Sequence, residues 1–360
     1  MTAWSVFVAC RGAGDGRPDD PVATHTGTAP TFLWDDGEVL VVPDGDGLTL
    51  FDRDGDRVVS RDWADLVGSC ERCGGEGASA DGDGLLVSFT TENPVSGGAV
   101  ARLTGDLSLD WRVDGFAFPH DAVRDPADDT VLIPEIGGSR ITWIEGDGAS
   151  NAPLRRLDTA TDGWQAAGPN GAERLDHDGR TYVLFSHRGG WGGTGFIDLW
   201  DITTPGSPVR RWRFPESGAL RIPHGPVFRV FGGHTWLVYA HSKATDASST
   251  VGLAWADDPT RPPTYVADLL PVGDEAPLDF LRGVELTSDG QLWLTDSGPG
   301  GGGSTRPEGR VLRGRIPADL EPSGRSGAWD DLSFVEFTPE PFATDLVNPF
   351  EGWLWTGPLP

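Results

Sequence analysis

One unit recurs along most of the chain, and this repetition constrains the fold more than any other feature of the sequence. Each copy contains a strand-like run, an acidic or glycine turn, a strongly apolar run and a polar end. Seven copies align, over residues 28–44, 76–90, 120–135, 170–187, 224–241, 282–296 and 344–357. From the second copy onward the starts lie 44 to 62 residues apart. This spacing is typical of one four-stranded β-propeller blade per repeat.

Composition and periodicity support an all-β fold built from such blades. The 360 residues include 51 glycines and 29 prolines, which break helices and build turns. Further strand-like runs with apolar residues at alternate positions follow the units, for example at residues 139–145 and 153–159 after the third copy. We therefore expect four strands per blade, named A to D in chain order, in one domain spanning residues 1–360.

The last copy bears on the number of blades. It offers only two strands before Pro360, and two unpaired strands would leave an open blade edge. The run at residues 4–9 precedes the first copy, where an outer strand is needed. We therefore predict a seven-bladed propeller closed by a clasp, with inner strands from the C-terminus and an outer strand and linker from residues 1–26. A six-bladed ring with terminal extensions is the alternative.

The charge balance restricts the possible partners. The chain has 28 basic and 55 acidic residues, a net charge of −27, whereas nucleic acids and anionic membranes need clustered basic side chains. No apolar run approaches the roughly 20 residues of a membrane span. We expect a monomer with a small-molecule substrate. Residues 3–10 resemble either a β-strand or a lipoprotein signal that lacks the basic n-region. We expect a periplasmic or secreted protein.

The cysteines exclude two kinds of site. There are three, Cys10, Cys70 and Cys73, and an odd number does not suit a disulfide framework. Residues 70–73 form a single CxxC motif in a glycine-rich turn, without the second pair of a four-cysteine zinc site. A local disulfide or two free thiols are the remaining alternatives.

The copies also predict which side chains meet at the central channel, because the start of strand A and the end of strand B open on the same face. The A-strand starts include Glu76, His120, Asn170, His224 and Arg282, and the B-strand ends include Glu135, His187, His241 and Asp296. Four of the seven histidines fall in these two registers. Imidazoles together with carboxylates suit a divalent metal such as zinc, iron, manganese or copper.

We assign a candidate role to each of these residues. The predicted metal ligands are His120, His224, Glu135, Glu76 and Asp296, for a divalent ion such as zinc, iron, copper or calcium. The predicted catalytic residues are His187, His241 and Arg282. The predicted substrate-binding residues are Arg282, Asn170 and Trp191, because a guanidinium presents a planar fork to carboxylate, phosphate or sulfate. The structural alternative is ordinary pairing between blades, such as Arg282 with Glu76.

Several blade sequences resemble those of known propellers. Residues 118–126, 130–135, 138–141, 223–227 and 282–297 resemble the NHL-type repeat and the blades of bacterial arylsulfotransferases and gluconolactonase-like propellers. In those families, rim residues of successive blades hold calcium or zinc, or provide a catalytic histidine with a sulfate-binding arginine. The resemblance therefore implies such roles for His120, His224 and Arg282. Glu76 and Asn170 match positions of a lactonase calcium site, where the other positions here carry histidine.

Three functions follow from these expectations. The preferred one is a metal-assisted hydrolase or lyase that acts on a small, anionic substrate at the channel mouth, with the metal polarising a carbonyl or activating water. The second is a metal-free, histidine-dependent transferase similar to an arylsulfotransferase. The third is a non-catalytic propeller that binds a protein or a glycan. Among these three functions, the sequence favours an enzyme.

Overall fold

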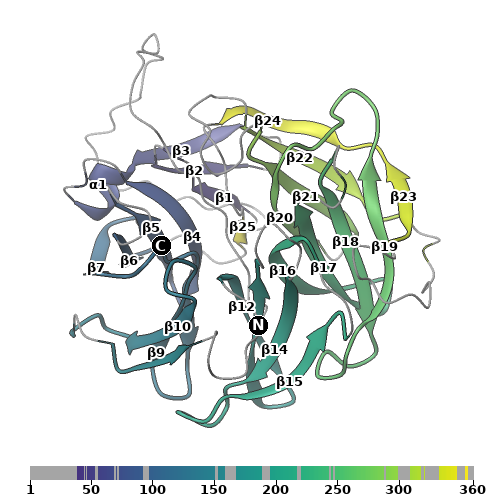
Figure 1. Ribbon diagram of the computed structural model, residues 1–360. Coiled ribbons are helices and arrows are strands. Elements are labelled where there is room, and N and C mark those ends of the chain that lie inside the picture. Colours follow the sequence, from purple (N-terminus) through teal and green to yellow (C-terminus); the bar gives the residue numbers. More distant parts are fainter. Residues whose placement is uncertain are drawn as a thin grey trace.

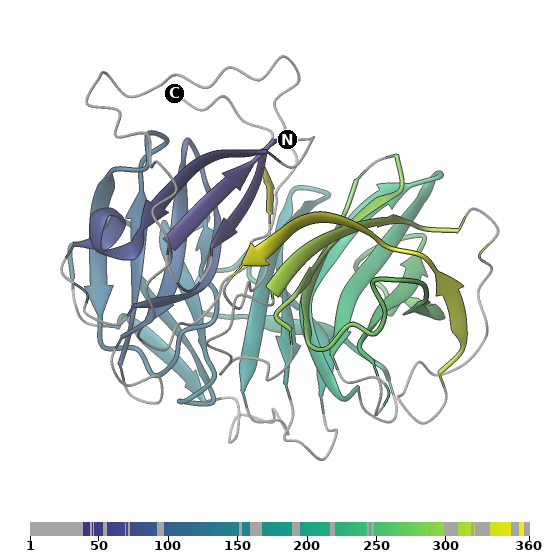
Figure 2. The ribbon, with the colours of Figure 1, turned by 90° about the horizontal axis from the view of Figure 1, so that it is seen from above.

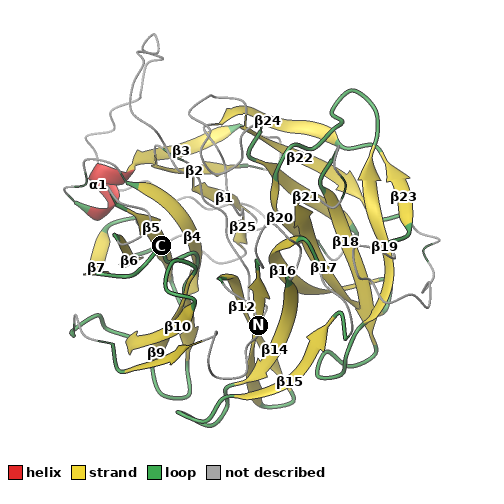
Figure 3. Cartoon of the chain, viewed as in Figure 1, coloured by secondary structure: helices red, strands yellow, loops and turns green. Residues whose placement is uncertain are grey.

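The structure, a computed structural model, consists almost entirely of strands (Figure 3). It describes residues 39–43, 45, 47–52, 56–68, 70, 73–91, 97–150, 153–158, 168–188, 195–216, 220–242, 245, 248–287, 289–298, 309–317, 320, 332–346 and 353–355. Within these ranges the one helix is α1 (Trp63–Val67). No helix among them is both long and apolar enough to cross a membrane.

The strands form six sheets arranged as blades around a central axis (Figure 1). Blade 1 contains, from the axis outward, β25 (Trp353–Trp355), β1 (Val39–Pro43), β2 (Gly47–Phe51) and β3 (Arg57–Asp62). Blade 2 contains β4 (Gly74–Asp81), β5 (Gly84–Thr90), β6 (Gly98–Leu103) and β7 (Leu109–Asp114). Blade 3 contains β8 (Val123–Asp125), β9 (Thr130–Glu135), β10 (Arg140–Glu145) and β11 (Arg155–Asp158).

The other three blades complete the ring. Blade 4 contains β12 (Pro169–His177), β13 (Arg180–His187), β14 (Phe196–Asp201) and β15 (Val209–Phe214). Blade 5 contains β16 (Ile222–Phe231), β17 (His234–Ser242), β18 (Thr250–Ala256) and β19 (Thr264–Pro271), with β23 (Phe334–Phe337) added parallel to β19. Blade 6 contains β20 (Leu281–Leu286), β21 (Gln291–Asp296), β22 (Gly309–Arg315) and β24 (Glu340–Leu346).

The all-β propeller prediction is confirmed, but the preferred number of seven blades is wrong, and the ring has six. The two strands expected to form a seventh blade are divided between two existing blades. Strand β24 pairs with β22 as the outer strand of blade 6, and β25 pairs with β1 as the inner strand of blade 1. Each strand thereby covers an edge that would otherwise be open. Figure 2 shows yellow β24 extending from the green blades toward purple blade 1.

The clasp that closes the ring therefore differs from the predicted one. A C-terminal strand supplies the inner position of a blade whose three outer strands come from residues 39–62. The predicted clasp strand and linker within residues 1–26 lie outside the described residues. Residues 332–337 follow the sixth copy of the repeat, where the pattern of four strands per blade predicts the outer strand of that blade, but they extend blade 5 as β23.

The core lies between neighbouring blades. Every residue of β5 and β9 is buried, whereas the outer strand β3 is largely exposed. The central strands are covered on both faces by the adjacent blades, which explains why they read as continuous apolar runs. Leu86 and Val100 of blade 2, for example, pack in one cluster with Val131 and Ile133 of blade 3.

Four inner strands, β4, β12, β16 and β20, are irregular at the end where they begin. In β4, Gly75 and Gly77 pair with consecutive residues of β5, so Glu76 between them is left out of the ladder. The same irregularity leaves out Asn170 in β12 and Arg282 in β20, and it follows His224 in β16. A β-bulge redirects the side chain it carries, so each blade here can point one polar residue at its neighbours.

Gly77 shows how closely the blades approach at this level. A Cβ atom on Gly77 would lie 2.5 Å from the backbone oxygen of His120 in the next blade. Only glycine fits such an approach without displacing the backbone. This packing places the backbone of His120 directly against the strand that carries Glu76.

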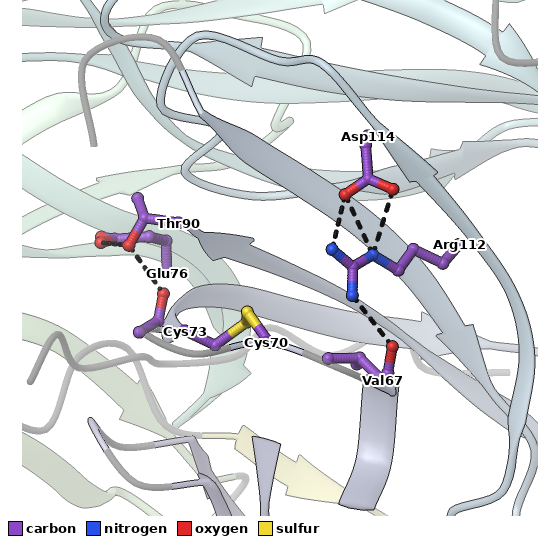
Figure 4. The surroundings of a disulfide bond; sticks show 8 residues. Val67, Cys70, Cys73, Glu76, Thr90, Arg112 and Asp114 are labelled. Carbon is purple, nitrogen blue, oxygen red and sulfur yellow. Dashed lines mark hydrogen bonds and ion pairs between the residues drawn. A yellow bond between two sulfur atoms is a disulfide. The ribbon is translucent and has the colours of Figure 1, made fainter. Parts of the chain in front are cut away.

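The two cysteines of the CxxC motif form a disulfide, Cys70–Cys73. It closes the segment that leads into β4, three residues before Glu76, and Figure 4 shows it near Glu76 and Thr90. The hydroxyl of Thr90 donates to the backbone oxygen of Gly74 at 3.0 Å and lies 3.5 Å from a carboxylate oxygen of Glu76. The start of β4 is thus anchored on both sides of Gly74.

Candidate functional site

Five residues from five successive blades meet at the axis, and we call them the axial cluster. They are Glu76, His120, Asn170, His224 and Arg282, from blades 2 to 6. All five were predicted from the alignment of the A-strand starts, and the structure brings all five together. None of them is more than 5 % exposed. The sequence thus predicted the membership of this cluster, and the roles of its residues remain predictions.

A chain of polar contacts runs through the cluster. Nε2 of His120 lies 3.4 Å from a carboxylate oxygen of Glu76, and Nδ1 of the same ring lies 3.1 Å from the backbone oxygen of Asn170. The side-chain nitrogen of Asn170 lies 3.0 Å from Nδ1 of His224. The centroids of the two imidazoles are 6.0 Å apart, close enough for both rings to contact one small molecule.

The two histidines are uncharged at neutral pH. Burial holds the pKa of both His120 and His224 well below 6.5, and the positive charges of Arg282 and Arg188 lower it further. A neutral imidazole keeps one nitrogen lone pair, so it can accept a proton or donate one hydrogen bond. The cluster therefore combines two neutral bases with cationic groups.

Arg282 is held in place by two neighbours. Its Nε donates to the hydroxyl of Ser297 at 3.1 Å, and its guanidinium carbon lies 4.7 Å from the ring centre of Phe280. Phe280 also meets His224 edge-on at 5.8 Å, as Phe118 meets His120 at 5.3 Å. Aromatic rings thus flank both imidazoles and give the site apolar walls.

Two predicted metal ligands lie outside the axial cluster. Both carboxylate oxygens of Glu135 accept from Arg140, at 2.8 and 2.7 Å, and one also accepts from the backbone N–H of Ala117 at 2.6 Å. Asp296 is held similarly, by Arg310 and by the backbone N–H groups at positions 279 and 280. These carboxylates tie the segment entering each inner strand to its own blade, which explains why they do not join the histidines.

Two predicted catalytic histidines are also built into their own blades. His241 has Nδ1 2.9 Å from Asp268, and its Nε2 accepts from the backbone N–H of Arg221 at 3.2 Å. His187 is completely buried, with Nε2 3.9 Å from a carboxylate oxygen of Asp198 on the neighbouring strand. The structure therefore does not bring either ring to the axial cluster, and both make structural contacts at the ends of their strands.

The reason is the alternation of side chains along a strand, since a shift of one residue reverses the face. Arg188 and Ser297, each one residue beyond the predicted positions 187 and 296, interact with the cluster instead. Arg188 acts electrostatically on both imidazoles, and Ser297 binds Arg282. Sequence analysis missed both. Tracing the alternation of β13 from Ser186, whose hydroxyl contacts Asn170, would have found Arg188.

The described residues leave two predictions open. Trp191, expected to bind substrate, lies outside them. Within the described part of the chain, no group of three or more His, Cys, Asp or Glu side chains is arranged to hold a metal ion. The cofactor therefore stays a prediction, and the guanidinium charges beside His120 and His224 oppose a cation there.

A second group of charges lies farther along the same inner strands. Nε and Nη2 of Arg229 on β16 donate to the two carboxylate oxygens of Glu285 on β20, at 2.6 and 2.8 Å, and Nη1 donates to Glu173 on β12. Two carboxylates thus share one guanidinium in the interior. Burial raises the pKa of Glu173 to about 7, although the charge of Arg229 opposes this shift.

This shift predicts a pH dependence of stability. Glu173 binds a proton more tightly in the folded chain than in the unfolded chain, so its contribution is complete below pH ~4.5 and is lost as the pH rises through about 7. Glu173→Gln, which mimics the protonated form, should therefore unfold at higher urea concentration than wild type at pH 8, and the difference should shrink toward pH 5. Glu340→Gln, at an exposed position, is the control. Parallel wild-type and Glu173→Gln curves across this pH range would contradict the prediction.

Comparison with known proteins adds information on the fold. No family model and no curated protein matches this chain. Among solved structures, the periplasmic gluconolactonase PpgL of Pseudomonas aeruginosa is 13 % identical over 99 % of this chain and 100 % of its own, with a TM-score of 0.50. A 6-phosphogluconolactonase-like protein of Bacteroides fragilis is 11 % identical over 89 % of this chain and 99 % of its own, with a TM-score of 0.49.

A further match comes from the structure of a nidogen/laminin complex, at 11 % identity over 84 % of this chain and 98 % of that one, with a TM-score of 0.48. At 13 % identity, the match to the Pseudomonas protein shows a shared fold and nothing more. At the level of architecture, the resemblance to gluconolactonase-like propellers is confirmed. The chain is a six-bladed β-propeller with a fold similar to that of the Pseudomonas gluconolactonase.

Proposed function

We propose that the chain is a hydrolase that acts on a small anionic ester or lactone at the axial cluster. The observation that carries this proposal is the placement of Arg188 and Arg282 beside two uncharged imidazoles in a protein of net charge −27. In a strongly acidic protein, a local excess of positive charge at the axis favours a negatively charged ligand there. The neutral bases next to it supply the reactive groups.

The two arginines would bind the charged end of the substrate. A guanidinium presents parallel N–H groups that match carboxylate, sulfate or phosphate oxygens, and Arg282 is already oriented by Ser297 and Phe280. Arg188 is the more exposed of the two and would meet the ligand first. Phe118 and Phe280 provide an apolar surface for the uncharged part of the molecule.

His120 is the best-placed general base. Its Nδ1 donates to a backbone oxygen, so the lone pair of the neutral ring is on Nε2. Nε2 would take a proton from water as the water oxygen attacks the carbonyl carbon, and the leaving alcohol would then recover that proton. Glu76, 3.4 Å from Nε2, would stabilise the imidazolium formed in between.

One observation favours a second candidate, the metal-assisted reaction. Two ligands of a tetrahedral zinc ion with bonds of about 2.1 Å lie roughly 3.4 Å apart, which matches the 3.4 Å between Nε2 of His120 and Glu76. An ion at this point would have these two side chains as ligands and would polarise the substrate carbonyl. The arginines beside it make this arrangement the weaker of the two candidates.

Elemental analysis and a substrate screen separate these candidates. The tag-free protein would be assayed with sulfate esters, phosphate esters, carboxylated esters and lactones, before and after exhaustive chelation. We expect hydrolysis of at least one anionic substrate, undiminished by chelation, in protein without stoichiometric transition metal. About one metal ion per chain, lost together with activity, would favour the metal-assisted reaction. Absence of turnover across the whole panel would contradict both.

We also propose that the protein works outside the cytoplasm. The Cys70–Cys73 disulfide suits an oxidising compartment, and the Pseudomonas neighbour is described as periplasmic. That neighbour's description as a gluconolactonase is the reason for including lactones in the screen. Fractionation of the native host, with detection of this chain, tests the location.

A further inference from the structure

The Cys70–Cys73 disulfide lies directly before the strand that carries Glu76 (Figure 4). Residues 74, 75 and 77 are glycines, so Glu76 bears the only side chain between Cys73 and Ala78. Glycine has the greatest backbone freedom of all residues and no side chain to pack. The position of the Glu76 carboxylate therefore depends on how firmly the backbone is anchored where β4 begins.

Two anchors hold this backbone. The hydroxyl of Thr90 donates to the backbone oxygen of Gly74 at 3.0 Å. The disulfide packs in the buried cluster that contains Val67, whose backbone oxygen accepts from Nη1 of Arg112 at 3.0 Å. The ladder between β4 and β5 is interrupted at Glu76. Without the disulfide, the short stretch before this interruption is a strand end of the kind that opens locally.

The anchored carboxylate contacts the base of the proposed mechanism. One carboxylate oxygen of Glu76 lies 3.4 Å from Nε2 of His120. A displacement of about 1 Å in a positioned group can lower a reaction rate by about 10²-fold. Opening the disulfide would therefore reach the axial cluster through Glu76, although neither cysteine belongs to the cluster.

The disulfide is also suited to opening without loss of the fold. The two cysteines are only three positions apart, and the stabilisation that a disulfide gives to a whole domain grows with the length of the loop it closes. Cys70 is partly exposed, whereas Cys73 is only 7 % exposed. An external thiolate would therefore attack the sulfur of Cys70, and the sulfur of Cys73 would leave.

We propose that Cys70 and Cys73 form a redox switch that positions Glu76, so that the axial cluster is competent when the disulfide is closed and impaired when it is open. The inference rests on the proposed function for its effect on catalysis. To close the switch, the two thiols give two electrons and two protons to a protein disulfide, which becomes a dithiol. The chain would thus gain full activity on reaching an oxidising compartment.

The switch can be tested without any substrate. Folded full-length protein would be equilibrated with mixtures of reduced and oxidised dithiothreitol, and alkylation with mass spectrometry gives the fraction of open disulfide. In ¹³C-histidine-labelled protein, the ring signal of His120 is identified by its loss in His120→Gln. We expect this signal to shift in proportion to the open fraction, while the signal of His234 stays unchanged. A disulfide that resists reduction in folded protein, or an unshifted His120, would overturn the inference.

Cysteine variants separate the switch from other effects of the reductant. Cys70→Ala/Cys73→Ala should show the His120 signal of the reduced protein and should not respond to dithiothreitol. Cys10→Ser removes the third cysteine of the chain and should respond as wild type does. A folded double variant with the signal of the oxidised protein would overturn the inference. If the double variant does not fold, the reversible titration of wild type decides.

Activity distinguishes failure of this inference from failure of the proposed function. On a substrate found in the screen, reduction should lower kcat by about 10²-fold, with a smaller change in KM, and reoxidation should restore it. A redox-dependent His120 signal in a protein without hydrolytic activity would refute the proposed function and leave the control of Glu76 intact. Hydrolysis at the same rate in both redox states would refute only the switch.

Discussion

Replacing Arg229 by methionine should lower the free energy of unfolding by about 3–5 kcal/mol at pH 7, the usual cost of removing one partner from a buried charge network. The guanidinium binds Glu285 through two nitrogens and Glu173 through a third. Methionine fills much of the same volume, so the loss reports the unpaired carboxyls more than a cavity. Urea denaturation followed by circular dichroism measures the change.

The pH dependence of this loss identifies its cause. Both carboxyls can be neutralised by protonation, so the destabilisation of Arg229→Met should shrink as the pH falls toward 5. Arg315→Met is the control, because Arg315 pairs with Asp289 on the surface, where both side chains are mostly exposed, and such pairs contribute about 0–1 kcal/mol. A loss in Arg229→Met no larger than in the control would show that the buried network does not hold the blades together.

His120→Gln should lower kcat/KM by about 10²- to 10⁴-fold on any substrate identified in the screen, the range expected for losing a general base. Glutamine keeps a polar group near Asn170 and Glu76 but cannot take up a proton. Because burial and Arg282 hold the pKa of His120 well below 6.5, the wild-type kcat/KM should stay constant as the pH falls to that value and decline only below it.

His234→Ala is the matched control for this variant. His234 lies at the opposite end of the strands, exposed at the start of β17, and its loss should leave kcat/KM unchanged. A fully active His120→Gln would remove His120 from the mechanism. An acidic limb centred above pH 7 in wild type would contradict the uncharged state of the buried ring.

The repeat was enough to predict the propeller and most of its strands, because apolar B strands such as β5 and β9 are covered by blades on both sides. It did not predict the number of blades. The two final strands look like one more A–B pair in sequence, and only the pairing of β24 with β22 and of β25 with β1 shows that they complete two other blades. Strand partners far apart in the sequence are not encoded in local periodicity.

The candidate site, like the fold, was predicted only in part. Residues at the A-strand starts were predicted correctly as neighbours because every repeat places them at the same point of the ring. The residues at the B-strand ends were assigned to the wrong face, because a shift of one residue along a strand reverses the side on which a side chain lies. His187 lies near Asp198 of its own blade. The next residue, Arg188, acts on the axial cluster instead. The bulges that redirect Glu76, Asn170 and Arg282 have no sequence signal beyond the glycine that follows each of them.

The central claim, recognition of an anionic substrate beside a neutral base, is tested most directly by a matched pair of esters. Hydrolysis of 4-nitrophenyl hemisuccinate would be compared with that of its uncharged methyl ester, in wild type and in Arg188→Gln/Arg282→Gln. We predict a kcat/KM about 10- to 100-fold higher for the anionic ester in wild type, the value of one charge-assisted contact, and loss of this preference in the double variant. Equal rates for the two esters in wild type, unchanged by the double substitution, would contradict the account.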